Sequence, residues 1–220
     1  YLNGTAMGIN NVTVNNDVLA KENIDDSDTD FNKGAYNGTN VTGNGNDANV
    51  TLTATDGVVF DGTDDSMARG ADLTGNADGK TGTFSVWLRI NGGDGALQQI
   101  YNTADADSVH IARNTANKFV VYVESTGGTA LLTNSGMVST TSYTTSTTWR
   151  HLLASWDMAA GVSYLYVNDV DDESGATTVT NDNIDYTRTN HFIGIRRDAS
   201  SKANMNMAEY WFAHEFVDIS

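Results

Sequence analysis

Acidic side chains gather in short, turn-rich segments of the sequence. Asp61, Asp64 and Asp65 lie close together around Gly62. A second group follows further along the chain: Asp169, Asp171 and Asp172. Proteins bind calcium through several carboxylate and carbonyl oxygens carried on turns, so the first group is a candidate calcium site. Aspartate in turns also bonds to its own backbone, and that alternative interpretation needs no metal.

Aromatic side chains are a second source of binding chemistry, because a sugar can stack on a flat, exposed ring beside polar groups. Trp87 is well placed for this, because it lies in an alternating segment whose apolar residues Phe84 and Val86 point to the opposite face of the strand. Aromatic residues also build the core of a β-sandwich, so each ring has a core alternative. The candidate carbohydrate-binding residues are Trp87, Tyr101, Tyr122 and Trp156.

Catalytic signatures are weak. The sequence has no Gly-x-Ser-x-Gly turn, and His214-Glu215 has no second histidine three residues on. A retaining glycosidase needs two carboxyl groups about 5 Å apart. Glu209 and Glu215, six residues apart, would lie about 20 Å apart along a regular strand. We therefore predict a protein that is not an enzyme and that uses no cofactor other than the candidate calcium.

The charge balance excludes two classes of partner. Lys and Arg total 12 and Asp and Glu total 28, so the net charge is −16. Nucleic acid and anionic membrane surfaces would repel such a chain. No apolar run approaches the about 18 residues of a transmembrane helix, and without Cys there is no disulfide. Because the chain begins at Tyr1, we expect a processed product or part of a longer protein.

Two regions differ in pattern. Residues 1–49 are rich in Asn, Gly and Thr, with scattered apolar residues. They are either an extended arm that orders on a partner or added strands of the main domain. Residues 50–220 carry many short alternating segments separated by Gly, Asn and Asp, and Phe84, Val86, Leu88 and Ile90 share one face. This pattern predicts an all-β, antiparallel two-sheet jelly-roll sandwich.

Six segments in order resemble the concanavalin A-like lectin/glucanase superfamily in its laminin-G-like form. Asn168-Asp169 departs from the family pattern, because no Gly follows at the hairpin turn. The segments are Val59-Phe-Asp-Gly-Thr-Asp-Asp-Ser66, Thr83-Phe-Ser-Val-Trp-Leu-Arg-Ile90, Trp149-Arg-His-Leu-Leu-Ala-Ser-Trp-Asp157, Tyr164-Leu-Tyr-Val-Asn-Asp169, Phe192-Ile-Gly-Ile195 and Met207-Ala-Glu-Tyr-Trp-Phe212.

The closing run, residues 207–220, also resembles the end of laminin-G-like domains in tailed-phage virion proteins. That resemblance implies a non-enzymatic protein of the virion surface: a capsid decoration, tail fibre or spike. Its arm would contact a capsid or tail protein or neighbouring copies in a homo-oligomer, and the jelly-roll would adhere to a cell-surface glycan. The alternative is a carbohydrate-binding lectin module of a bacterial secreted, extracellular protein.

Overall fold

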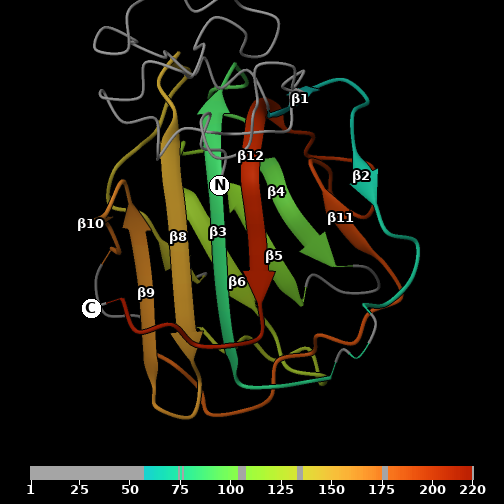
Figure 1. Ribbon diagram of the computed structural model, residues 1–220, viewed down its shortest axis with the longest axis vertical. Helices are drawn as coiled ribbons and strands as arrows, with labels where there is room; N and C mark the ends of the chain where they lie inside the picture. The colour runs from blue at the N-terminus through green and yellow to red at the C-terminus, as the bar shows by residue number, and fades with distance from the viewer. Residues whose placement is uncertain are drawn as a thin grey trace, which may run out of the picture. The chain divides into compact units, whose positions relative to one another are not determined.

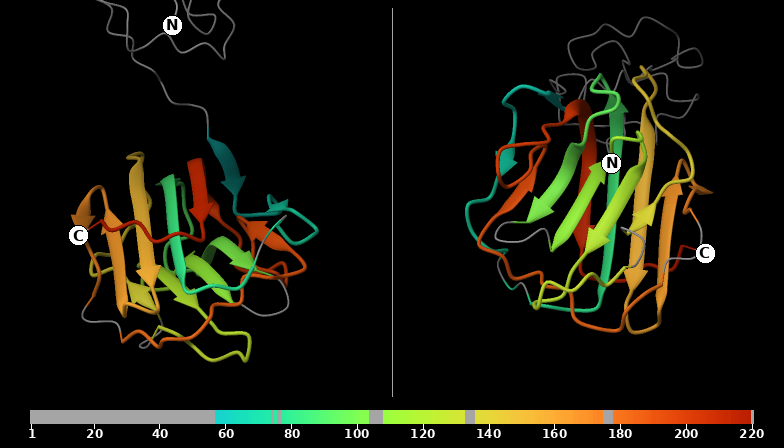
Figure 2. Two further views of the ribbon diagram at one scale, coloured as in Figure 1. Left: turned by 60° about the horizontal axis from the view of Figure 1, so that its bottom comes forward. Right: turned by 180° about the vertical axis from the view of Figure 1, so that it is seen from behind.

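The computed structural model describes residues 57–73, 75, 77–103, 108–132, 136–174 and 178–219. These residues form two antiparallel sheets of six strands each, packed face to face (Figures 1 and 2). Sheet one has the order β1 (Val58–Asp61), β12 (Asn204–Ala213), β3 (Thr81–Ile90), β8 (Arg150–Asp157), β9 (Val162–Val167) and β10 (Val170–Asp171). Sheet two has the order β2 (Met67–Ala68), β11 (His191–Ile193), β4 (Gln98–Thr103), β5 (Val109–Arg113), β6 (Phe119–Val123) and β7 (Met137–Val138).

The predicted all-β jelly-roll sandwich is confirmed. Strands far apart in the sequence lie side by side: β12 pairs with both β1 and β3, and β11 pairs with both β2 and β4. No helix of the described residues is long and apolar enough to cross a membrane. The expected arm or added strands of residues 1–49 lie outside the described residues.

The core lies between the two sheets and follows the alternation of β3. Phe84, Val86, Leu88 and Ile90 are fully buried, whereas Ser85 and Trp87 point to the outer face of sheet one. Period-two alternation directs successive side chains to opposite faces of a strand. The inner residues of β3 therefore bury apolar surface, and the outer ones remain available for contacts.

A β-bulge in β12 changes which side chains face outward. Met207 pairs with Leu88 and faces the core, but the register shifts between Ala208 and Trp211. Glu209 takes a φ of 50° within this bulge. Simple alternation from Met207 would turn residue 211 inward, and the extra residue instead turns Trp211 outward.

The chain after β12 crosses the outer face of sheet one (Figure 1). The Thr83 hydroxyl donates to the carbonyl of Glu215 at 2.7 Å and accepts from the amide of Val217 at 3.1 Å. Phe216 then stacks on Tyr164 of β9, with ring centroids 6.0 Å apart. This segment lies over the part of the sheet that carries Thr83, and Trp87 stands further along β3.

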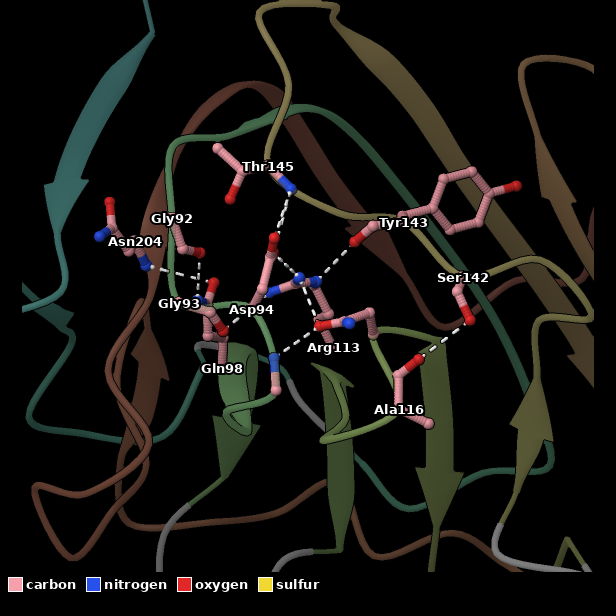
Figure 3. A network of polar contacts seen from close by, with 12 residues as sticks. Gly92, Gly93, Asp94, Gln98, Arg113, Ala116, Ser142, Tyr143, Thr145 and Asn204 are labelled. Atoms are coloured by element: carbon pink, nitrogen blue, oxygen red, sulfur yellow. Dashed lines mark hydrogen bonds and ion pairs between the residues drawn. The ribbon is translucent and has the colours of Figure 1, made fainter.

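A buried arginine ties together the loops at one end of sheet two (Figure 3). Arg113 is fully buried and pairs with Asp94. Its Nε donates to the Tyr143 carbonyl at 2.7 Å, and its Nη1 donates to the Gly93 carbonyl at 3.1 Å. Asn117 accepts from Nη2 at 2.6 Å. Because these partners satisfy the guanidinium, its charge can be buried, and we assign it a structural role.

Candidate functional site

Trp87 offers an exposed ring on the outer face of sheet one. It is 38% exposed and stands opposite His151 of β8. The two rings stack, with centroids 5.1 Å apart and planes 24° apart. His151 Nε2 also forms a hydrogen bond of 2.8 Å with the Ser85 hydroxyl. A rigid, partly exposed tryptophan beside hydroxyl and imidazole groups is suited to stacking against a sugar ring.

Trp211 is a second exposed ring on this face. It is 46% exposed and pairs in register with Ser85, while Trp87 pairs with Ala208. The two tryptophans therefore stand on neighbouring strands, two residues apart along β3. We call Ser85, Trp87, His151 and Trp211 the tryptophan face. The sequence pattern did not single out Trp211, because its outward direction depends on the bulge.

The structure does not gather the four predicted aromatic residues into one site. Trp156 is fully buried, and its Nε1 donates to the Tyr186 hydroxyl at 3.0 Å. Gly82 packs so closely on this ring that an added Cβ would collide with it. Trp156 is thus a core residue that offers no ring face to a sugar, and its predicted place in the binding surface is wrong.

Tyr122 and Tyr101 lie apart from Trp87. Tyr122 is half-buried on β6 of sheet two, and its hydroxyl donates to Glu124 at 2.8 Å. Tyr101 on β4 is 4% exposed, so its ring cannot serve as an open platform. It instead contributes to the lining of a pocket between the edges of the two sheets.

This pocket, which we call the edge pocket, has a volume of about 560 Å³. β12 forms one side, and β2, β4 and β11 form the other. Eight of its ten lining residues are apolar or aromatic, and the other two are Arg69 and His191. The lining consists of Met67, Ala68, Arg69, Leu73, Tyr101, His191, Ile193, Tyr210, Trp211 and Phe212.

A chain of polar groups connects Tyr101, His191 and Asp72 at this pocket. The Tyr101 hydroxyl lies 2.6 Å from His191 Nδ1, and His191 Nε2 lies 3.3 Å from Asp72 Oδ1. Burial lowers the pKa of His191, although the hydrogen bond to Asp72 opposes this shift. Burial and the charge of Asp72 raise the pKa of Tyr101. The tyrosine therefore keeps its proton. When the imidazole carries its own proton on Nε2, facing Asp72, the Tyr101 hydroxyl donates a hydrogen bond to Nδ1.

The candidate calcium ligands come together in the structure. One carboxylate oxygen from each of Asp61, Asp64 and Asp65 lies within 4.8 Å of the other two, at the exposed end of β1 and on the turn that follows it. The Asp65 carboxylate also accepts from the Asp61 amide at 2.9 Å, and Asp61 accepts from Thr63 at 2.6 Å. Hard oxygen ligands of this kind suit Ca²⁺, while the same bonds fit an ordinary Asx-type turn. Calcium binding here stays a prediction.

The second group of aspartates does not form a comparable cluster. Asp172 is buried, and its carboxylate accepts from Thr140, Thr141 and Tyr143. Asp169 is 92% exposed beside His151. Asp172 therefore anchors a loop, which explains its burial without a metal.

Comparison with known proteins decides the family. A laminin G family model, described as the concanavalin A-like lectin/glucanases superfamily, matches residues 60–212. The chain belongs to this superfamily. No curated protein matches the chain in sequence.

Solved structures of other proteins are similar in fold. A proposed carbohydrate-binding protein from Bacteroides ovatus has a TM-score of 0.55 and 13% identity, over 73% of this chain and 44% of that one. The binding domain of botulinum neurotoxin serotype G has a TM-score of 0.54 and 8% identity, over 73% of this chain and 40% of that one. The chain thus spans less than half the length of either protein.

Proposed function

We propose that this chain is a non-catalytic carbohydrate-binding module, and that the tryptophan face holds the glycan. The observation that carries the proposal is the exposed Trp87 ring, which is stacked on His151 while Ser85 bonds to that imidazole. The ring is held in place before binding, so little side-chain freedom is lost when a sugar stacks on it. Membership of a superfamily that includes lectins supports this assignment, as does the fold shared with the Bacteroides protein.

Binding is favoured over hydrolysis because Glu209 and Glu215, six residues apart, do not have the spacing of a glycosidase carboxylate pair. Glu209 sits in the bulge of β12, and Glu215 follows the strand in the segment that crosses Thr83. A reducing-end assay on each bound glycan tests this part of the proposal. We expect no release of reducing ends, and steady release that is lost in Glu209→Gln would establish a hydrolase instead.

The experiment for glycan binding compares two aromatic positions. A glycan array identifies ligands, and calorimetry then measures their affinity for the wild-type chain, Trp87→Ala and Tyr122→Ala. Loss of a central aromatic anchor costs about 2 kcal/mol or more, or about thirtyfold in Kd. We expect this loss for Trp87→Ala and near wild-type affinity for Tyr122→Ala, which lies on the other sheet. An array without ligands, or equal effects of both variants, would overturn the proposal.

We further propose the virion surface as the location, with the exterior of a bacterium as the alternative. The support is the resemblance of residues 207–220 to the end of laminin-G-like domains in tailed-phage virion proteins, together with the acidic, Asn- and Thr-rich composition. Residues 1–49 would attach the module to a capsid or tail protein or to neighbouring copies. Removal of residues 1–49 should abolish sedimentation with purified particles while glycan affinity is unchanged. Undiminished particle binding by the shortened chain would contradict the role of the arm.

A further inference from the structure

The edge pocket and the tryptophan face share one residue. Trp211 lies on the outer face, where it pairs with Ser85, and it also lines the pocket beside Tyr210 and Phe212. The bulge at Glu209 produces this arrangement, since it turns Tyr210 and Phe212 inward while Trp211 turns outward. Trp211 therefore belongs to both surfaces, which adjoin at β12.

Tyr210 brings an unusual polar group to this pocket. Its ring packs edge-on against Phe84, with centroids 5.1 Å apart, and lies 6.3 Å from the ring of Tyr101. The Tyr210 hydroxyl is buried and has no hydrogen-bond partner among the residues that the structure describes. An unsatisfied buried hydroxyl is costly, so a ligand that supplies an acceptor gains the missing bond.

The remaining lining limits the chemistry of that ligand. Met67, Ile193 and Phe212 offer apolar contacts. The two polar side chains of the lining already have partners: His191 bonds to Tyr101, and Arg69 Nε donates to the Asp72 carbonyl at 2.9 Å. A bare sugar hydroxyl would lose water against such walls, with few groups to replace it. An acetamido group instead combines an apolar methyl with a strong carbonyl acceptor.

We propose that the edge pocket receives the N-acetyl group of an amino sugar, while the adjoining sugar residues of the same glycan stack on Trp211 and Trp87. The acetyl methyl packs among Met67, Ile193 and Phe212. The acetyl carbonyl accepts a hydrogen bond from Tyr210. This inference rests on the proposed glycan-binding function and adds the class of sugar that the site selects.

A matched pair of glycans tests the selection. Chitotetraose and cellotetraose have the same backbone of linked glucose rings. They differ at C2 of each ring, which carries an acetamido group in chitotetraose and a hydroxyl in cellotetraose. We expect chitotetraose to bind the wild-type chain about tenfold more tightly in calorimetry, the scale of one hydrogen bond with an apolar contact. Equal affinities, or tighter binding of cellotetraose, would overturn the inference.

Two variants separate the pocket from the tryptophan face. Tyr210→Phe keeps the ring and removes the unpartnered hydroxyl, so the chain should be no less stable to heat while its preference for chitotetraose falls about fivefold. Ile193→Phe fills the pocket and should remove the preference while cellotetraose binding is retained. A thermal melt checks that each variant is folded. A preference that survives in both folded variants would contradict the role of the pocket.

The outcomes also distinguish this inference from the function on which it rests. If array ligands lack N-acetyl groups and depend on Trp87, the glycan-binding function stands and the pocket assignment fails. If neither the array nor the two tetrasaccharides shows binding, both fail. Saturation-transfer NMR with N-acetylglucosamine gives a direct readout, because the acetyl methyl should receive the strongest saturation and Ile193→Phe should abolish it.

Discussion

The ring of Trp87 stacks on the imidazole of His151 across the β3–β8 pair, with centroids 5.1 Å apart. Ser85, two residues before Trp87, forms a hydrogen bond with the same imidazole and so restricts its rotation. The tryptophan is thereby supported on one side by a residue that need not touch the glycan. His151 is in this sense a positioning residue for the proposed site.

The first prediction concerns this support. His151→Ala should weaken glycan binding about fivefold, because the Trp87 ring gains rotamers that must be lost again on binding. Ser85→Ala removes only the hydrogen bond and should have a smaller effect in the same direction. Calorimetry measures both, and the entropy of binding should become less favourable in His151→Ala. Unchanged affinity in His151→Ala would show that the stack has no part in binding.

The alternation of β3 was enough to predict its core residues and the exposure of Trp87. The same rule, applied to β8, places Trp156 with Leu152 and Ala154 on the inner face, where all three are buried. The signal against a surface role for Trp156 was therefore present in the sequence. Alternation alone does not decide between core and surface, because the inner face of a strand is buried only where a second sheet covers it. In the structure β8 lies in the middle of sheet one, and its inner face is covered.

The edge pocket could not be predicted in the same way. The outward turn of Trp211 depends on a bulge at Glu209, a residue with a positive φ that is neither glycine nor asparagine. The contact between Tyr101 and His191 joins residues 90 positions apart through the pairing of β4 with β11. Local patterns carry no information on such long-range pairing, so the pocket residues appeared only in the folded chain.

A second prediction concerns calcium at Asp61, Asp64 and Asp65. If the cluster binds Ca²⁺, millimolar calcium should raise the midpoint of thermal unfolding, since a ligand that binds only the folded state stabilises it. Asp64→Asn should abolish the increase, while the matched variant Asp198→Asn should retain it. Equilibrium dialysis with ⁴⁵Ca then counts the bound ions. An unchanged midpoint together with no bound calcium would favour the turn interpretation.

The third prediction concerns pH and His191. Burial holds the pKa of His191 below its ordinary value of 6.5, so the unfolded chain binds more protons at this position than the folded chain. Stability from the neutral imidazole is complete above pH 6.5 and is lost as the pH falls through this value towards the lowered pKa. The pKa of His214 is also lowered, first by burial and then by the charge of His191, and adds in the same direction.

Urea unfolding at about pH 7.5 and 5.5, on either side of the ordinary histidine pKa, measures this dependence. The wild-type chain should lose free energy of unfolding between the two values, and His191→Gln should lose less. His214→Gln should also lose less than the wild type, because the pKa of that histidine is lowered by burial too. An identical loss in the wild type and His191→Gln would show that another group controls stability in this range.

The last prediction concerns the turn between β9 and β10. Asn168 and Asp169 have φ values of 52° and 63°, so the hairpin closes through two residues in the left-handed region. Such a turn favours Gly at its second position, and the family pattern has Gly after this segment. An aspartate with positive φ is strained because its Cβ approaches the backbone. Asp169→Gly should therefore raise the free energy of unfolding by about 0.5 to 1 kcal/mol.

Asn168→Gly is the control for this change. The Asn168 side chain accepts a hydrogen bond from the His151 amide at 2.8 Å, so its removal costs a contact that offsets any relief of strain. Denaturant unfolding should place Asn168→Gly at or below the wild-type stability and Asp169→Gly above it. Because Asp169 also lies 3.9 Å from His151 Nδ1, glycan affinity should be measured in the same variant. Lower stability in Asp169→Gly would show that this exposed contact with His151 outweighs the backbone strain of the turn.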